Sequence, residues 1–131
     1  MALFGGIEAG GTKFVCGIGT SPDDFEVHSF PTVGPVESVR QAIQFFQDKA
    51  GSRLAALGIA SFGPIDLDRT SPTYGYITTT PKTAWRNFDL VGALSKELAV
   101  PVTFETDVNA AALAEVEWVP LETWRTVSIS Q

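Results

Sequence analysis

The first part of the chain alternates short apolar runs with polar breaks and then changes to helical spacing. Two apolar runs, at residues 3–9 and 13–19, have the length of strands, and the Gly10-Gly11 pair between them predicts a tight hairpin turn. Residues 25–30 alternate well enough to predict a third strand. Residues 36–50 follow with helical spacing, so a meander of three strands is expected to lead into a helix.

This predicted helix has a start signal, an end signal and an apolar face. Pro35 suits its first turn, and Gly51 suits its end. The spacing predicts that four apolar residues share one face: Val36, Val39, Ile43 and Phe46.

The rest of the chain predicts alternating strands and helices around one long loop. The loop, residues 66–88, is rich in Thr, Pro, Gly and aromatic residues, and long ordered loops usually carry function. Asp89 and Asp107 each stand where a helix N-cap is expected. A meander followed by such alternation indicates an α/β fold with a mixed sheet and flanking helices. The predicted elements are a strand at 54–60, a short strand at 76–79, a helix at 90–98, a strand at 102–105 and a helix at 108–115.

Composition narrows the class of protein. The 131 residues are one domain's length, and 44% hydrophobic with 18% charged residues is typical of a globular protein. The net charge of −6 without a basic cluster argues against a nucleic-acid partner. Cys16 is the only cysteine and lies in an apolar run, which favours a small core residue over a reactive thiol. No leader or membrane-spanning run is visible, and we expect a cytoplasmic protein with no membrane partner.

The first hairpin carries the first candidate site, Glu8-Ala9-Gly10-Gly11-Thr12-Lys13. Its glycines let the backbone approach a ligand, and exposed N–H groups, the Thr12 hydroxyl and the Lys13 charge can hold phosphate oxygens. The Glu8 carboxylate can hold a metal-bound water. Taken alone, an ordinary Gly-Gly hairpin with a surface lysine is the better explanation, and a P-loop is excluded because the turn joins two strands.

Two further segments lie before and within the long loop. Ser61-Phe62-Gly63-Pro64-Ile65-Asp66 follows a predicted buried strand, and ligands of open sheets bind at strand ends. A simple strand-terminating turn explains this segment equally well. The segment 79–85, with its threonine pair, Pro81 and Trp85, can form a wall against a sugar. The alternative is an irregular loop pinned by a buried tryptophan.

The fourth segment, residues 105–112, opens the last predicted helix. A carboxylate at Asp107 can accept the proton of a substrate hydroxyl during phosphoryl transfer, and Asn109 can bind a second hydroxyl. The run Ala110-Ala111-Ala112 would let the helix pack closely on the sheet. By position alone, Asp107 is more simply a helix N-cap.

Together and in this order, the four segments resemble the ROK family of sugar kinases from Leu3 to Glu115, and its fructokinase branch most of all. Glu8 stands where most other members have Asp, which points to fructokinase. The resemblance implies the actin- and hexokinase-like (ribonuclease H-like) fold, with this chain as the N-terminal lobe. It rests on residues 5–14, Gly63-Pro64-Ile65-Asp66, Ser71-Pro72-Thr73-Tyr74-Gly75, Thr80-Pro81-Lys82, Trp85 and residues 106–113.

The resemblance also implies a reaction and its residues. ATP with Mg²⁺ would phosphorylate a hexose, D-fructose to fructose 6-phosphate, with Asp107 as the base. Glucose, mannose and N-acetylated amino sugars stay open as substrates, and a homodimer stays open as the assembly. The phosphate side would be Glu8 (through water on Mg²⁺), Gly10, Gly11, Thr12 and Lys13, and the sugar side Gly63, Pro64, Thr80, Trp85 and Asn109.

The end of the chain departs from the family pattern. Residues 1–115 match the N-terminal lobe, whereas residues 116–131 form an atypical tail that suggests a frameshift or a split reading frame, and we expect the C-terminal lobe to be absent. The resemblance implies zinc on His and Cys ligands in full-length relatives. This chain lacks those ligands, and its one histidine, His28, is expected on a strand face. Kinase activity of this chain is therefore expected to be weak or absent. The alternative is an inactive lobe with at most sugar binding.

Overall fold

The structure is a computed structural model, and it describes residues 3–20, 24 and 26–106. Its centre is a five-stranded mixed sheet with the order β3-β2-β1-β4-β7. The first three strands form an antiparallel meander, and β4 and β7 run parallel to β1. The strands are β1 Leu3–Ala9, β2 Lys13–Gly19, β3 Glu26–Pro31, β4 Leu54–Ser61 and β7 Val102–Thr106.

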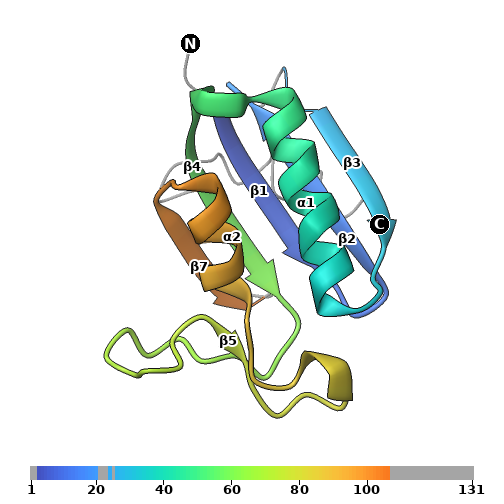
Figure 1. Cartoon of the computed structure of the whole chain (residues 1–131), viewed down its shortest axis with the longest axis vertical. Helices are drawn as coiled ribbons and strands as arrows, with labels where there is room; N and C mark the ends of the chain where they lie inside the picture. Colours follow the sequence, from blue (N-terminus) through green and yellow to red (C-terminus); the bar gives the residue numbers. More distant parts are fainter. Residues whose placement is uncertain (1–2, 21–23, 25, 107–131) are drawn as a thin grey trace.

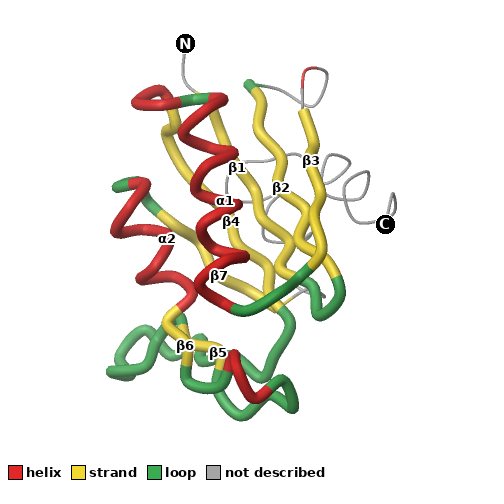
Figure 2. The backbone as a smooth tube through the Cα atoms, turned by 45° about the vertical axis from the view of Figure 1, so that its right-hand side comes forward, coloured by secondary structure: helices red, strands yellow, loops and turns green. Residues whose placement is uncertain are grey.

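Two helices lie side by side on one face of this sheet, α1 Pro35–Lys49 and α2 Leu90–Leu98 (Figures 1 and 2). Strand side chains alternate between the two faces, so every second residue points into the layer beneath the helices. That layer is the hydrophobic core of the described part, and its fully buried side chains include Ile7, Phe14, Cys16, Phe46, Leu57, Leu90 and Leu94. Burial of these core residues therefore holds the sheet and the helices together.

The hairpin, the strands and both helices in the described part confirm the prediction of a mixed α/β sheet, with boundaries that differ by one or two residues. Pro35 occupies the first turn of α1, as predicted. Cys16 is buried, and burial raises the pKa of its thiol, which fits a core residue. No helix within the described ranges is long and apolar enough to cross a membrane.

The predicted face of α1 is wrong at its first residue. Val36 is 77% exposed, whereas Val39 and Phe46 are buried. The buried stripe runs along Ser38, Val39, Ala42, Phe45 and Phe46, and Val36 lies about a third of a turn away from the centre of that stripe. Four apolar residues at helical spacing were thus not enough to locate the stripe, because small Ser38 and Ala42 also face the sheet.

Asp89 is the N-cap of α2, as predicted. Its Oδ1 accepts a hydrogen bond of 2.8 Å from the backbone N–H of Gly92. The predicted helix at 108–115 and the tail at 116–131 lie outside the described residues.

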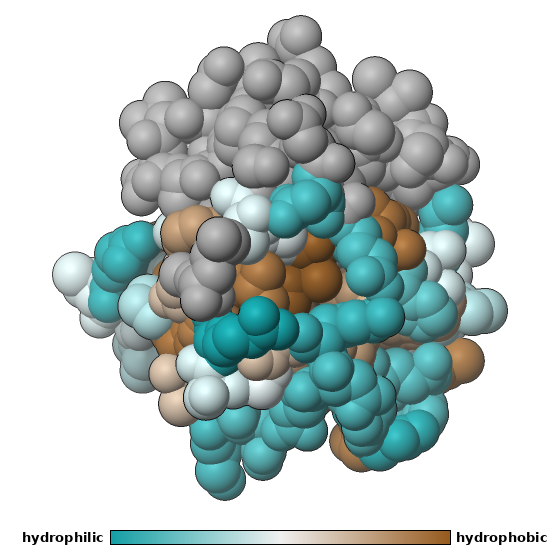
Figure 3. Space-filling view, turned by 90° about the horizontal axis from the view of Figure 1, so that it is seen from above, coloured by the Kyte–Doolittle hydropathy of each residue, from teal (hydrophilic) through white to brown (hydrophobic). Residues whose placement is uncertain are grey.

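A long segment connects β4 to α2 at the end of the sheet where the parallel strands point (Figure 1). It contains the short strands β5 Tyr76–Ile77 and β6 Phe88–Asp89, which pair antiparallel, and a 3₁₀ turn at Thr83–Trp85. Another 3₁₀ turn, Gly51–Arg53, joins α1 to β4 at the opposite end. Viewed from that opposite end, hydrophobic residues show in the middle of the face and at a few places on its rim, with hydrophilic residues between them (Figure 3).

Candidate functional site

The three parallel strands of the sheet end side by side. Their register pairs Ala9 with Ser61 and Ser61 with Thr106. The backbone N–H of Phe62 donates to the carbonyl oxygen of Ala9 at 2.9 Å, which joins the turn after β4 to the last residue of β1. Ligands of open α/β sheets bind at this carboxyl edge. Three of the four candidate segments therefore start from one place in the fold.

The hairpin turn after β1 directs its carbonyl groups toward Thr32. The Thr32 hydroxyl donates to the Gly10 carbonyl oxygen at 2.7 Å, and the Thr32 N–H donates to the Thr12 carbonyl oxygen at 2.8 Å. The backbone N–H groups of Gly11 and Thr12 have no hydrogen-bond partner among the described residues. A turn that offers two free N–H groups, with the carbonyl oxygens of Gly10 and Thr12 already bonded, is suited to an anion.

Gly10 is required by this turn for steric reasons. A Cβ at Gly10 would lie 2.7 Å from the carbonyl oxygen of Lys13, which itself accepts the Gly10 N–H at 3.0 Å. Any side chain here would break the hydrogen bond that closes the turn. The double glycine is thus part of the tight geometry, whichever ligand the turn holds.

Glu8 and Lys13 lie on the face of the sheet that the helices do not cover. Ile7, Ala9 and Phe14 belong to the core beneath the helices, so their neighbours Glu8 and Lys13 point to the other face. The β1–β2 register sets Lys13 diagonally across from the half-buried Glu8. A carboxylate and an ammonium group are thus held near each other beside the Gly-Gly turn.

Glu105 joins them on the same face. It pairs with Ala60, and Ala60 pairs with Glu8, so the two carboxylates stand in one row across β1, β4 and β7. Glu105 could not be related to Glu8 from the sequence alone, because only the strand register places the two carboxylates in one row.

The turn after β4 presents Gly63 and Pro64, which are both exposed. The peptide bond between them is cis. The N–H of Thr78 donates to the Pro64 carbonyl oxygen at 2.8 Å, so the strand-like residues 76–80 run beside this turn. The exposed main chain at Gly63 agrees with the expectation that a ligand can approach it there.

Thr80 and Trp85 are buried, with 1% and 2% of their surfaces exposed. The indole N–H of Trp85 donates to the Val33 carbonyl oxygen at 3.0 Å, and its ring packs against Phe14 and Phe62. The expected sugar wall at Trp85 does not match this geometry, because the ring has no free face. The alternative, a loop pinned by a buried tryptophan, describes it instead.

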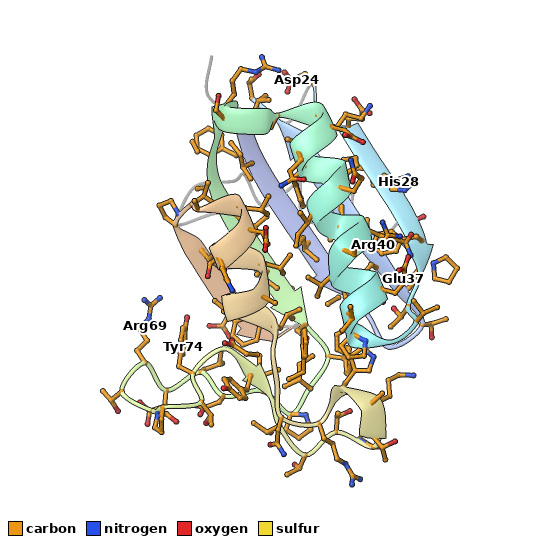
Figure 4. All side chains as sticks on the ribbon, in the orientation of Figure 1. Asp24, His28, Glu37, Arg40, Arg69 and Tyr74 are labelled. Atoms are coloured by element: carbon orange, nitrogen blue, oxygen red, sulfur yellow. The ribbon has the colours of Figure 1, made fainter. Side chains whose placement is uncertain are left out.

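Asp66 organises the next part of the loop. Hydrogen bonds from the hydroxyls of Thr73 and Ser71 and from the N–H of Asp68 stabilise its carboxylate, and they lower the pKa of Asp66 below its ordinary value. Arg69 from the same loop lies over the ring of Tyr74, 5.6 Å from its centre (Figure 4). These hydrogen bonds make Asp66 a stabilising group for the loop conformation.

We expect Asp66→Asn to lower the free energy of unfolding at neutral pH. The difference in that free energy between wild type and variant should become smaller as the pH is lowered. Because the folded-state pKa is lowered, the ionised carboxylate stabilises the fold above its ordinary pKa of 3.8, and that contribution is lost as the pH falls through the folded value. Urea denaturation of the wild type and variant from about pH 7 to about pH 3 measures the difference.

Asp48→Asn, which removes a charge from the exposed side of α1, is the matched control. A difference between wild type and Asp66→Asn that stays constant over this range would contradict the role given to the carboxylate. The pKa of Asp68 is also lowered, by hydrogen bonds from the hydroxyl and N–H of Thr70, so Asp68 contributes to the acid dependence of both proteins. The difference in unfolding free energy between wild type and Asp66→Asn removes that shared contribution.

A groove of about 440 Å³ lies elsewhere, between β3 and α1. Its walls include His28, which stacks on Phe45 with ring centres 5.7 Å apart, and the ion pair of Lys49 with Glu26 at 2.6 Å. His28 thus lies on a strand face, as predicted, on the same side of the molecule as Glu37 and Arg40 (Figure 4). The groove is remote from the carboxyl edge and contains none of the candidate residues.

Asp107 and Asn109, the expected base and sugar ligand, lie outside the described residues. Thr106 is the last described residue, and it ends β7 at the carboxyl edge. Sequence analysis missed Thr32, whose two hydrogen bonds set the hairpin turn, because a threonine between a strand and a helix carries no local signal.

The sequence model of the ROK family matches residues 4–128. The chain is 49% identical over 116 residues to a fructokinase of Streptococcus mutans and 50% identical over 117 residues to a putative fructokinase of Bacillus subtilis. It is 28% identical over 121 residues to a glucokinase of Streptomyces coelicolor. These matches cover 86%, 86% and 90% of this chain but only 39%, 37% and 37% of the relatives, so the chain spans less than half of their length.

Solved structures share the fold. The ROK hexokinase of Thermus thermophilus superposes with a TM-score of 0.65 at 29% identity, over 86% of this chain and 38% of that one. A ROK family glucokinase of Streptomyces griseus in complex with glucose and AMPPNP gives 0.66 at 23% identity, over 89% of this chain and 37% of that one. The mixed sheet and its two helices therefore correspond to part of a larger kinase fold.

Proposed function

The chain belongs to the ROK family, and we propose that it forms the sugar- and phosphate-binding lobe of an ATP-dependent hexose kinase with D-fructose as its substrate. One observation carries the proposal. The anion-suited turn at Gly10–Lys13 and the exposed Gly63-Pro64 turn both follow strands at the carboxyl edge of the sheet, and β7 ends at the same edge with Thr106. Fructose as the substrate is supported by the 49% identity to a fructokinase against 28% to a glucokinase.

In the proposed reaction, a sugar hydroxyl attacks the γ-phosphorus of ATP. The bond from that phosphorus to the β-phosphate oxygen breaks, a bond to the sugar oxygen forms, and the hydroxyl proton passes to Asp107. The N–H groups of Gly11 and Thr12, with Lys13, hold phosphate oxygens at the turn. The chemistry is then mostly positioning and charge stabilisation.

Glu8 is the proposed contact to Mg²⁺, through a coordinated water. Mg²⁺ in nucleotide sites typically keeps several waters and takes only one or two carboxylates besides the phosphates. The half-buried Glu8 carboxylate beside the Gly-Gly turn fits that demand. Mg²⁺ would supply charge neutralisation on the β- and γ-phosphates.

The sugar side is proposed to consist of Gly63 and Pro64, with Asn109 from the segment after β7. Thr80 and Trp85 would support this side indirectly, because both side chains are buried and the Trp85 ring packs against Phe62, next to the Gly63-Pro64 turn. The Thr78 N–H, which donates to the Pro64 carbonyl oxygen, holds the loop beside the same turn.

A chimera tests the proposal directly. Residues 4–115 of this chain would replace the matching segment of the Streptococcus mutans fructokinase, and ATP consumption would be measured with fructose, glucose and mannose. We expect turnover with a preference for fructose. Turnover that prefers glucose or mannose would contradict the proposed substrate.

The isolated chain would be assayed beside the chimera. A folded chimera without turnover on any hexose, with the parent enzyme active, would contradict the proposed kinase function. Sugar binding by the isolated chain without turnover would fit a lobe that binds sugar but does not transfer phosphate.

A further inference from the structure

We propose that Lys82 is a second phosphate ligand, whose ammonium group binds the phosphoryl group held at the Gly10–Lys13 turn. This inference rests on the proposed function and deepens it, because it adds a residue from the long loop to the phosphate side of the site. The loop was expected to serve only the sugar.

The position of the Lys82 side chain is the first observation. A Cβ built on Gly11 would lie 3.2 Å from Cε of Lys82, and within the described part of the chain no other atom outside the turn would come within 4 Å of it. Cε is the last carbon before the ammonium nitrogen. The charged end of Lys82 therefore lies against the turn whose Gly11 N–H has no partner among the described residues.

The charge balance at the turn is the second observation. Lys13 and Lys82 approach it from segments far apart in the sequence, and neither forms an ion pair with an acidic residue in the described part of the chain. The ion pairs present there belong to Arg40 and Lys49, on α1. Two lysines at one anion-suited turn, neither of them in an ion pair with the nearby Glu8, favour an anionic ligand.

The loop holds Lys82 in place at its backbone. The N–H of Lys82 donates to the buried Thr80 hydroxyl at 3.3 Å, and its carbonyl oxygen accepts the Trp85 N–H at 2.9 Å. The buried indole of Trp85 is in turn bonded to Val33, next to the Thr32 that holds the turn. The buried residues of the loop thus position the backbone of Lys82 beside the turn, and its exposed side chain reaches Gly11 from there.

The phosphoryl group in transfer is the ligand that fits this placement. Lys13 belongs to the turn that would hold the nucleotide phosphates, whereas Lys82 belongs to the loop beside Pro64, where the sugar would lie. A cation between the two can contact the group both before and after it moves. Lys82 should therefore matter for a γ-phosphate and for a sugar phosphate.

Titration of the isotope-labelled chain with inorganic phosphate, ATP and fructose 6-phosphate tests this, with the amide signals of Gly11 and Thr12 as the readout. We expect Lys82→Met to weaken all three by roughly fivefold or more, and Lys82→Arg to restore most of the loss. Lys96→Met, which removes an exposed charge from the last turn of α2, is the matched control and should bind like the wild type.

The outcomes separate this inference from the function on which it rests. Wild-type binding that Lys13→Met weakens and Lys82→Met leaves unchanged would overturn the role of Lys82 alone. An effect of Lys82→Met on ATP without one on fructose 6-phosphate would overturn its contact with the transferred group. A wild type in which none of the three phosphates shifts Gly11 or Thr12 would contradict the proposed phosphate turn itself.

Discussion

Replacing Gly75 by alanine is expected to lower the free energy of unfolding by about 2–5 kcal/mol, the sum of backbone strain and overpacking. Gly75 has a φ of +89°, which a residue with a Cβ rarely adopts. A Cβ there would also stand 2.7 Å from Cβ of Val91, in the first turn of α2. Moving the loop away from Val91 would break two backbone hydrogen bonds. The Gly75 carbonyl oxygen accepts the Val91 N–H at 3.2 Å, and the Gly75 N–H donates to the Asp66 carbonyl oxygen at 2.9 Å.

Gly51→Ala provides the matched control. Gly51 also has a positive φ, +56°, but a Cβ there would meet nothing within 4 Å. We therefore expect this variant to lose only the strain component, about 1–2 kcal/mol. Urea denaturation followed by far-UV circular dichroism measures both variants. If Gly75→Ala were no worse than Gly51→Ala, the contact with Val91 would contribute nothing.

Gly75 also shows where sequence patterns stop being informative. The strands, the hairpin and the Asp89 cap were predictable because each depends on neighbours within a few residues. Gly75 was visible only as one glycine in a long loop, and its need to be a glycine comes from Val91 in another element. The same reason explains why two short 3₁₀ turns and the strand Phe88–Asp89 were missed.

The residues of the candidate site also differ in whether local sequence could predict them. The turn at Gly10–Lys13 and the strand end before Gly63 were found from sequence, since glycines after apolar runs mark strand ends. Thr32 and Lys82 were assigned no role, because they reach the turn through the fold and not through the chain. For Trp85 the sequence left a sugar wall and a buried anchor of the loop both open, and the structure shows the buried anchor: its indole N–H donates to the Val33 carbonyl oxygen.

Replacing Asp107 by asparagine is expected to lower kcat of the chimera by about 10²–10⁴-fold, the usual contribution of a general base. The reason is chemical, because an amide cannot take the proton that the sugar hydroxyl must lose. We expect KM for fructose to change little, since the lost interaction belongs to the transition state. The measurement is steady-state ATP consumption at saturating and limiting fructose.

This substitution also separates the two explanations of Asp107, a base and a helix cap. Asparagine caps helices about as well as aspartate, so Asp107→Asn should leave the free energy of unfolding nearly unchanged. Asp107→Ala removes both properties and should cost about 1 kcal/mol of stability in addition to activity. If Asp107 were only a cap, Asp107→Asn would keep full turnover and Asp107→Ala would lose stability first. Loss of turnover in both variants, with stability lost only in the alanine variant, would establish that Asp107 serves as base and cap together.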